Sequence, residues 1–163
     1  MNFRGAIETA GNMGNVVVQR YLEDLSDGDL MMRPGPGCNH IAWQIGHVIA
    51  SNSFLLDSLL PGSGQKLPEG FREQHSKDLT LNDDASQFRT KREYLELIDG
   101  MQAALKAALA NFSESQLDEP GPERFRSLFP TVGHMFMLVA NHVMMHAGQF
   151  AVVRRRLGKP VVI

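Results

Sequence analysis

Four segments of this sequence repeat apolar residues at intervals of three and four, which is the period of one helix face. Almost no stretch alternates apolar and polar residues as a half-buried strand does. The segments run over about residues 3–25, 39–60, 84–112 and 131–157. Glycine and proline follow the second and fourth segments, as they do where helices end. The pattern predicts an all-α fold, an antiparallel four-helix bundle with long connections after the second and third helices.

The helix ends and connections carry further expectations. Asn39 is a good N-cap residue for the second helix. The polar connection over about residues 61–84 is predicted to be a lid, a pocket wall or a mobile segment. Gly5, Gly11 and Gly14 either weaken the first helix or let a neighbouring helix or a ligand approach its backbone. Residues 154–156, three arginines in the last turn, are expected to lie in water and complement the helix dipole.

The composition fits one globular domain over residues 1–163. An apolar share of 43% and a net charge of −2 favour a packed core over disorder. The 16 basic and 18 acidic residues give no sign of nucleic-acid or anionic-membrane binding. Cys38 is the only cysteine, which excludes an internal disulfide framework and a thiolate cage for a metal. No targeting segment and no apolar run of bilayer length stands out, so we expect a cytoplasmic protein.

Two histidines are spaced four residues apart on the fourth predicted helix. His142 and His146 leave the same helix face, with Cβ atoms roughly 5–6 Å apart, so both rings can reach one divalent ion. Their neighbours are mostly apolar, and buried ring nitrogens need partners. The H-x-x-x-H spacing alone is weak evidence for a metal site. Val143 stands where a zincin metalloprotease needs its glutamate, so that class is excluded.

His47 strengthens the metal hypothesis because it lies in an apolar stretch of the second predicted helix. In a helical bundle it can supply a third imidazole from a facing helix. Three histidines leave coordination positions open for water or substrate, which is typical of catalytic rather than structural sites.

The sequence around these histidines resembles the DinB-like superfamily of metalloenzymes. His47 lies in NHIAWQIGHVIASNSFLL, and the histidine pair lies in HVMMHAGQFAVVRRRLGKP. The family marker is one histidine on the second helix and H-x-x-x-H on the last long helix, often followed by Gly-Gln, here Gly148 and Gln149. The resemblance spans nearly the whole chain. It implies a four-helix bundle that holds a divalent metal, commonly zinc or nickel, with His47, His142 and His146 as metal ligands.

The family resemblance also implies classes of activity. Members with assigned activity include bacterial thiol-cofactor transferases and a thiol-dependent isomerase, and many members have none assigned. Relatives often form homodimers, which makes a homodimer an expectation for this chain. The family name refers to DNA-damage induction and implies no DNA binding.

Five other side chains have less direct relations to the three histidines. His40 shares a helix face with His47, so it is either a substrate contact at the pocket mouth or a partly exposed first-turn residue. Gln149 is either a hydrogen-bond partner for a ligand imidazole or metal-bound water, or part of an ordinary helix contact. His134 is expected to be satisfied or on the surface, and His75 to be solvated in a loop. Cys38 is left out of the site.

The sequence supports two functional hypotheses. The first is a divalent-metal-dependent enzyme that transfers a low-molecular-weight thiol to an electrophile or hydrolyses a small substrate, through a metal-bound thiol or water. No carboxylate near either motif stands out as a general base, and this slightly favours thiol transfer. The second hypothesis is a non-catalytic metal- or ligand-binding helical bundle, such as a sensor or an accessory protein. The expected partners are a small-molecule substrate and a second copy of the chain.

Overall fold

The computed structural model of the chain describes residues 2–163 and is all-helical, as the sequence predicts. The four long helices are α1 (Phe3–Leu22), α2 (Ile41–Leu59), α4 (Lys91–Leu109) and α5 (Val132–Arg156). Helix α3 (Phe71–Gln74) is a single short turn in the connection between α2 and α4. Within residues 2–163 there is no strand, only an isolated bridge between Pro120 and Thr131.

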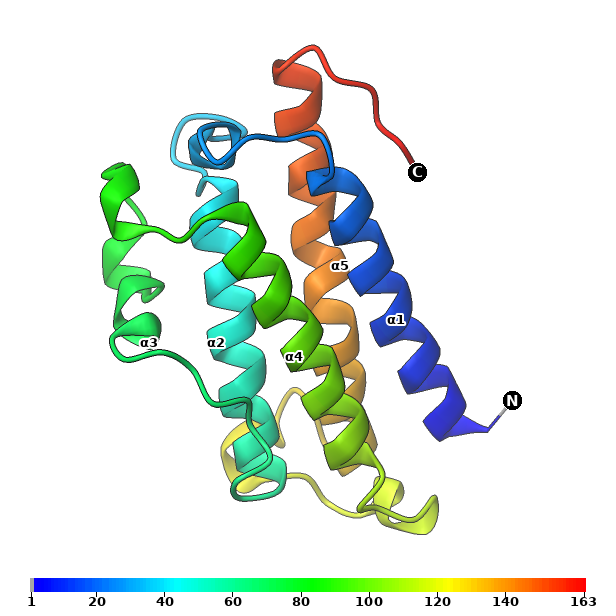
Figure 1. Cartoon of the computed structure of the whole chain (residues 1–163). Coiled ribbons are helices and arrows are strands. Elements are labelled where there is room, and N and C mark those ends of the chain that lie inside the picture. The colour runs from blue at the N-terminus through cyan, green and yellow to red at the C-terminus, as the bar shows by residue number, and fades with distance from the viewer. Residues whose placement is uncertain (1) are drawn as a thin grey trace.

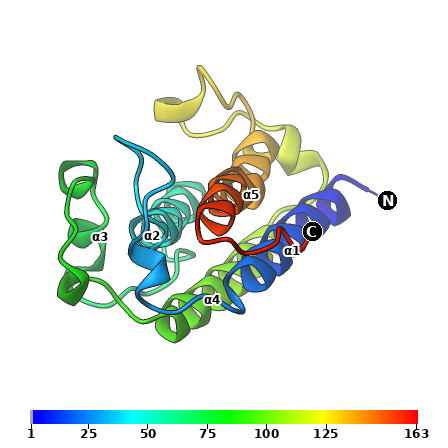
Figure 2. The same cartoon turned by 90° about the horizontal axis from the view of Figure 1, so that it is seen from above.

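The four long helices lie side by side, with α1 and α5 running in one direction and α2 and α4 in the other (Figure 1). Helix α5 packs against α1 and α2, and α4 packs against the same two helices from the opposite side (Figure 2). The neighbours α2 and α5 are therefore antiparallel, as are α1 and α4. The expected antiparallel order does not hold for α1 with α5 or for α2 with α4, which run parallel. The connection of residues 60–90 runs back along the length of the bundle, so that α4 starts at the same end of the bundle as α2. The two helices therefore run parallel.

Two helix starts differ from the prediction. Helix α2 is capped by His40, whose ring Nδ1 accepts the Trp43 backbone N–H, and not by Asn39. Helix α4 begins at Lys91 rather than near residue 84, because Thr90 and Glu93 form a capping box there. In both cases a local side-chain hydrogen bond sets the boundary, which helical periodicity alone does not locate.

The long connection after α2 is a folded pocket wall. It contains α3 and two short 3₁₀ helices, Lys77–Leu79 and Ala85–Gln87. Phe71 and His75 are buried against α2 and α4, and the His75 ring Nε2 hydrogen-bonds the Tyr94 hydroxyl at 2.8 Å. His75 is thus not the solvated loop residue that the sequence predicts, because it anchors this segment to the core.

Glycines on α1 mark where its neighbours approach most closely. A Cβ on Gly11 would lie 2.9 Å from Leu105 on α4, and one on Gly14 would lie 3.3 Å from Val143 on α5. Of the two roles considered for these glycines, close helix packing is the one the structure shows.

Arg154 is fully buried near the end of α5, although the sequence predicts that it lies in water. Its guanidinium donates to the Tyr21 and Pro160 carbonyls and to the carboxylate of Asp24. The hydrogen bond from Arg154 lowers the pKa of Asp24 to about 2. Arg155 and Arg156 are exposed, as expected.

Helix α5 is long and apolar enough to pass a length-and-composition test for a membrane span, with a mean hydropathy of 1.3 in its most apolar window. Half of that window is buried among the other helices. The central helix of a bundle has the same properties, so the test gives only weak evidence for a span.

Candidate metal centre

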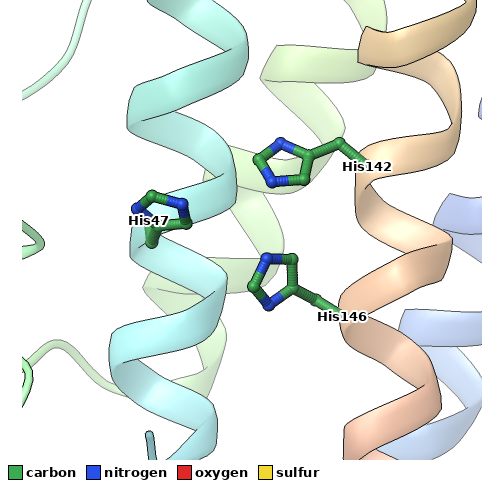
Figure 3. A group of neighbouring side chains, drawn as sticks. All are labelled: His47, His142 and His146. Atoms are coloured by element: carbon green, nitrogen blue, oxygen red, sulfur yellow. The ribbon is translucent and has the colours of Figure 1, made fainter. Parts of the chain in front are cut away.

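Three imidazoles converge in the space between α2 and α5. His47 projects from α2 toward His142 and His146 on α5 (Figure 3). Each ring offers one nitrogen, and these three nitrogens lie within 4.8 Å of one another. The ring centroids are 5.7 Å apart between His47 and either α5 histidine, and 5.0 Å apart within the α5 pair. The structure therefore brings together the three residues that the sequence predicts as metal ligands.

Helix geometry explains how each ring reaches this point. The i, i+4 spacing on α5 stacks His142 and His146 on the face that looks toward α2. On α2, the Trp43 ring lies 4.7 Å from that of His47 and nearly parallel to it, at 7°. This stacking restricts the orientation of the His47 ring, so its position does not depend on a bound ion.

Two buried amides orient the α5 imidazoles. Asn52 and Gln44, both on α2, place their side-chain oxygens 2.9 and 3.0 Å from Nδ1 of His142 and His146, respectively. The amide orientation is fixed, because Asn52 Nδ2 donates to the Val139 carbonyl and Gln44 Nε2 donates to the Asn39 carbonyl. The amide oxygens must therefore accept, so both Nδ1 atoms carry the proton. The two Nε2 atoms are left with lone pairs for a ligand bond.

His47 is oriented by backbone instead. The backbone of His75, which comes from the connection after α2, lies beside the ring in a polar contact that favours its protonated form. The neighbouring Gly46 makes this approach possible, since a Cβ at that position would overlap the His75 ring. Ser51, one turn further along α2, lies 3.5 Å from His47 Nε2.

The environment keeps the three imidazoles neutral. Burial lowers the pKa of His142 to about 3 and that of His146 to about 4, and the neighbouring histidines add to both shifts. Burial also lowers the pKa of His47, although the polar contact with the His75 backbone opposes this. A histidine binds a metal only as the neutral base. The site is therefore in its ligand-ready protonation state at neutral pH.

The donor set fits a divalent ion of borderline softness. Neutral imidazole nitrogens suit zinc, nickel, copper and iron, whereas magnesium and calcium prefer oxygen ligands. Bonds of about 2.0–2.1 Å require the three nitrogens to lie closer together than the 4.8 Å within which they fall here. The Nδ1–H groups of His142 and His146 donate hydrogen bonds to Asn52 and Gln44. Metal-binding histidines usually make such a supporting hydrogen bond with the ring nitrogen that does not bind the metal. The residues present therefore fit the metal that the sequence predicts.

The other candidates from the sequence lie elsewhere or act differently. His40 is buried rather than partly exposed, and both of its ring nitrogens contact backbone atoms, the Trp43 N–H and the Asn82 carbonyl. It caps α2, and a substrate contact at His40 stays a prediction. Gln149 is exposed, and Gln44 makes the ligand contact considered for it. His134 is exposed and pairs with Thr131, as expected for a surface histidine, and Cys38 is a free thiol in a loop.

Sequence reasoning missed three supporting groups, namely Asn52, Gln44 and the His75 backbone. Gln44 carries a detectable signal, because it stands among apolar residues at the start of α2, whereas Asn52 lies between Ser51 and Ser53 and does not stand out. Gln44 lies three residues before His47, and Asn52 lies five after it. The His75 contact gives no such signal, because it uses the backbone of a segment with no regular periodicity.

Comparisons with known proteins identify the family and agree with the fold. The sequence pattern of the DinB superfamily matches residues 16–150, so the chain belongs to the DinB superfamily. A similar solved structure is the conserved protein of locus from Enterococcus faecalis, with a TM-score of 0.74 and 16% identity. The match covers 98% of this chain and 99% of that one, and at this identity it shows the fold alone. No curated protein matches the sequence.

Proposed function

We propose that this protein is a divalent-metal-dependent enzyme that transfers a low-molecular-weight thiol to an electrophile. In this proposal the four long helices act as a four-helix bundle, with zinc or nickel held by His47, His142 and His146. The observation that carries the proposal is the pair of amide contacts, from Asn52 and Gln44, that leave two Nε2 lone pairs aimed at one point beside His47. Three protein ligands leave room in the coordination sphere for a substrate.

A bound divalent ion would lower the pKa of a thiol or a water molecule that it holds, and so favour the nucleophilic form. The protein's own part is to fix and polarise the ligands. The side-chain oxygens of Asn52 and Gln44 accept hydrogen bonds from the Nδ1–H groups of two ligands, and the Trp43 ring stacks on the third. These contacts keep the ligand nitrogens basic and limit their rotation.

The absence of a nearby general base favours thiol transfer over hydrolysis. Within residues 2–163, the candidate nearest along α2 is Asp57, and it is already engaged. Its Oδ1 accepts the Gly64 backbone N–H at 2.8 Å, and its Oδ2 lies 3.9 Å from Arg72. Hydrolysis of a small substrate therefore stands second, because it benefits from a base that removes a proton from water.

The test is a paired activity screen on metal-loaded protein purified without an affinity tag. One panel combines small thiols with an alkylating electrophile and measures the thioether product, and the other contains activated esters. The proposal predicts saturable thioether formation that His142→Ala abolishes together with metal binding. His134→Ala is the matched control, because His134 lies on the same helix but is exposed, and it should keep full activity.

A non-catalytic metal- or ligand-binding bundle, such as a sensor or an accessory protein, is the alternative. Stoichiometric metal with no turnover in either panel would support it and would contradict the enzyme proposal. A homodimer and a cytoplasmic location stay predictions. Met13 and Val16 support the first of these, since both are large apolar side chains exposed on α1.

A further inference from the structure

A pocket of about 490 Å³ opens beside the histidine centre and has a distinctive charge. His47 forms part of its wall, together with residues of α2, of the α3 connection and of the segment before α5. Three of its lining residues are cations, Arg72, Lys77 and Arg124, and none is a carboxylate. The whole chain carries a net charge of −2, so this excess of positive charge is local.

Two of the three cations are held against the pocket wall. The Arg72 guanidinium donates to the Ala50 carbonyl at 3.0 Å, and that of Arg124 lies 5.3 Å from the centre of the Phe54 ring. A guanidinium fixed by a carbonyl or an aromatic face keeps its charge and most of its N–H donors. Both groups are therefore positioned in advance to meet a ligand.

Neighbouring acids neutralise this charge only in part. Asp57 is the one carboxylate paired with the three cations within residues 2–163, and its contact with Arg72 is long, at 3.9 Å. Lys77 and Arg124 form no ion pair with any described residue. Acidic residues adjacent in sequence, such as Glu73, Asp78 and Glu123, do not line the pocket.

We propose that the substrate carries a carboxylate group, which Arg72, Lys77 and Arg124 bind while the reacting end of the molecule reaches the three-histidine centre. The inference rests on the proposed function, because it assigns the pocket to a substrate of that centre. A carboxylate matches the planar fork of a guanidinium, and three cations gathered at one pocket attract an anion together. His47 belongs to both the pocket wall and the ligand set, so one small molecule can span the two.

Matched thiols separate the carboxylate contribution from metal binding. The probes are 3-mercaptopropionate and 6-mercaptohexanoate, each compared with its own primary amide, on cobalt(II)-loaded protein. Thiolate coordination is read from the sulfur-to-cobalt charge-transfer absorption and needs no turnover. Exposed ion pairs contribute up to about 1 kcal/mol each, a factor of about five. Three cations together should therefore make at least one acid bind about tenfold more tightly than its amide.

A triple variant ties the preference to these three side chains. Arg72→Gln with Lys77→Gln and Arg124→Gln should lower the affinity of the preferred acid to that of its amide and leave the affinity of the amide unchanged. The control variant changes three exposed cations elsewhere to glutamine, namely Arg92, Lys106 and Arg155. It should keep the native preference for the acid over its amide. Added salt should weaken the preference in the native protein, because the cations are solvent-exposed.

The outcomes distinguish this inference from the proposed function. Equal affinity for acid and amide at both chain lengths, or a preference that survives in the triple variant, would overturn the carboxylate assignment and leave the metal centre intact. A protein that binds no cobalt would overturn the proposed function and this inference with it.

Discussion

The side-chain amide of Asn52 connects the candidate ligand His142 to the backbone of α5. Asn52 Oδ1 lies 2.9 Å from His142 Nδ1, and Asn52 Nδ2 donates to the Val139 carbonyl at 3.0 Å. Since Val139 and His142 are both on α5, one residue of α2 holds this part of α5 at two points. The ligand is thus positioned by a buried hydrogen-bonded group whose own orientation is fixed.

This relationship predicts that Asn52→Leu weakens metal binding without removing a ligand. Loss of such a supporting partner typically costs about 10–100-fold in metal affinity. The affinity is measured by competition with a chromophoric chelator. Gln149→Leu is the control, because Gln149 is exposed on α5, and its affinity should match that of the native protein. Native-like affinity in Asn52→Leu would show that the amide contact does not support the site.

The contact between Gly46 and His75 predicts opposite effects for two glycine substitutions in helices. A Cβ at Gly46 would overlap the His75 ring, so Gly46→Ala should lower the free energy of unfolding by about 1–3 kcal/mol, as overpacking does. It should also weaken metal binding, because His75 would be displaced and its backbone lies beside the His47 ring. Gly148→Ala on α5 meets no atom within 4 Å and should stabilise the protein by up to about 1 kcal/mol. Denaturant unfolding with and without zinc measures both effects, and equal effects of the two changes would contradict the packing described.

Buried His75 predicts a loss of stability in mild acid. Burial lowers its pKa to about 4, whereas the unfolded chain has the ordinary value of 6.5. Between these two values the unfolded state binds a proton that the native state does not. The free energy of unfolding therefore falls as the pH drops from 6.5 toward 4, by up to about 1.4 kcal/mol per pH unit for this group.

The acid effect is measured on metal-free protein, because bound metal would change the contributions of the ligand histidines. His142 and His146 have lowered pKa values as well and add slopes of the same sign. His75→Gln should remove about one proton from the dependence, while His134→Gln, at an exposed position, should leave it unchanged. An unaltered slope in His75→Gln would show that the ring is not held neutral.

The buried position of Arg154 predicts that replacing this one residue strongly lowers the free energy of unfolding. Arg154→Met removes the donor from the Tyr21 and Pro160 carbonyls and from Asp24, so the free energy of unfolding should fall by about 2 kcal/mol or more. The neighbouring Arg155 is exposed, and Arg155→Met should change stability by less than about 0.5 kcal/mol. Thermal and denaturant unfolding compare the two variants, and similar values for both would contradict the buried role of Arg154.

The sequence predicts the helices and the ligands because both follow from regular spacing. Periodic apolar residues locate four long helices, and the i, i+4 pair with His47 gives the three imidazoles that the structure brings together. The resemblance to the DinB superfamily points to the same three residues, and the chain's membership of that family is confirmed by the match over residues 16–150.

The parts that the sequence does not predict depend on contacts between distant segments. His40 caps α2 and His75 is buried through hydrogen bonds that no local pattern encodes. The sequence also predicts the helix directions only in part. It does not predict that α2 and α4 run parallel, because this depends on the path of a long irregular connection. Arg154 is buried because a cluster of acceptors from α1 and the C-terminal segment surrounds it, and its sequence neighbours give no sign of that cluster.

The most direct test of the metal centre is the metal content of protein purified without an affinity tag, measured by elemental spectroscopy after removal of loosely bound ions. We predict one divalent ion, zinc or nickel, per chain in the native protein. His47→Ala, His142→Ala and His146→Ala should each reduce this content strongly, and His40→Ala and His134→Ala should not remove the ion from chains that remain folded. A native protein with no stoichiometric metal that also fails to take up added zinc or nickel, or full metal retention in the three ligand variants, would contradict the account.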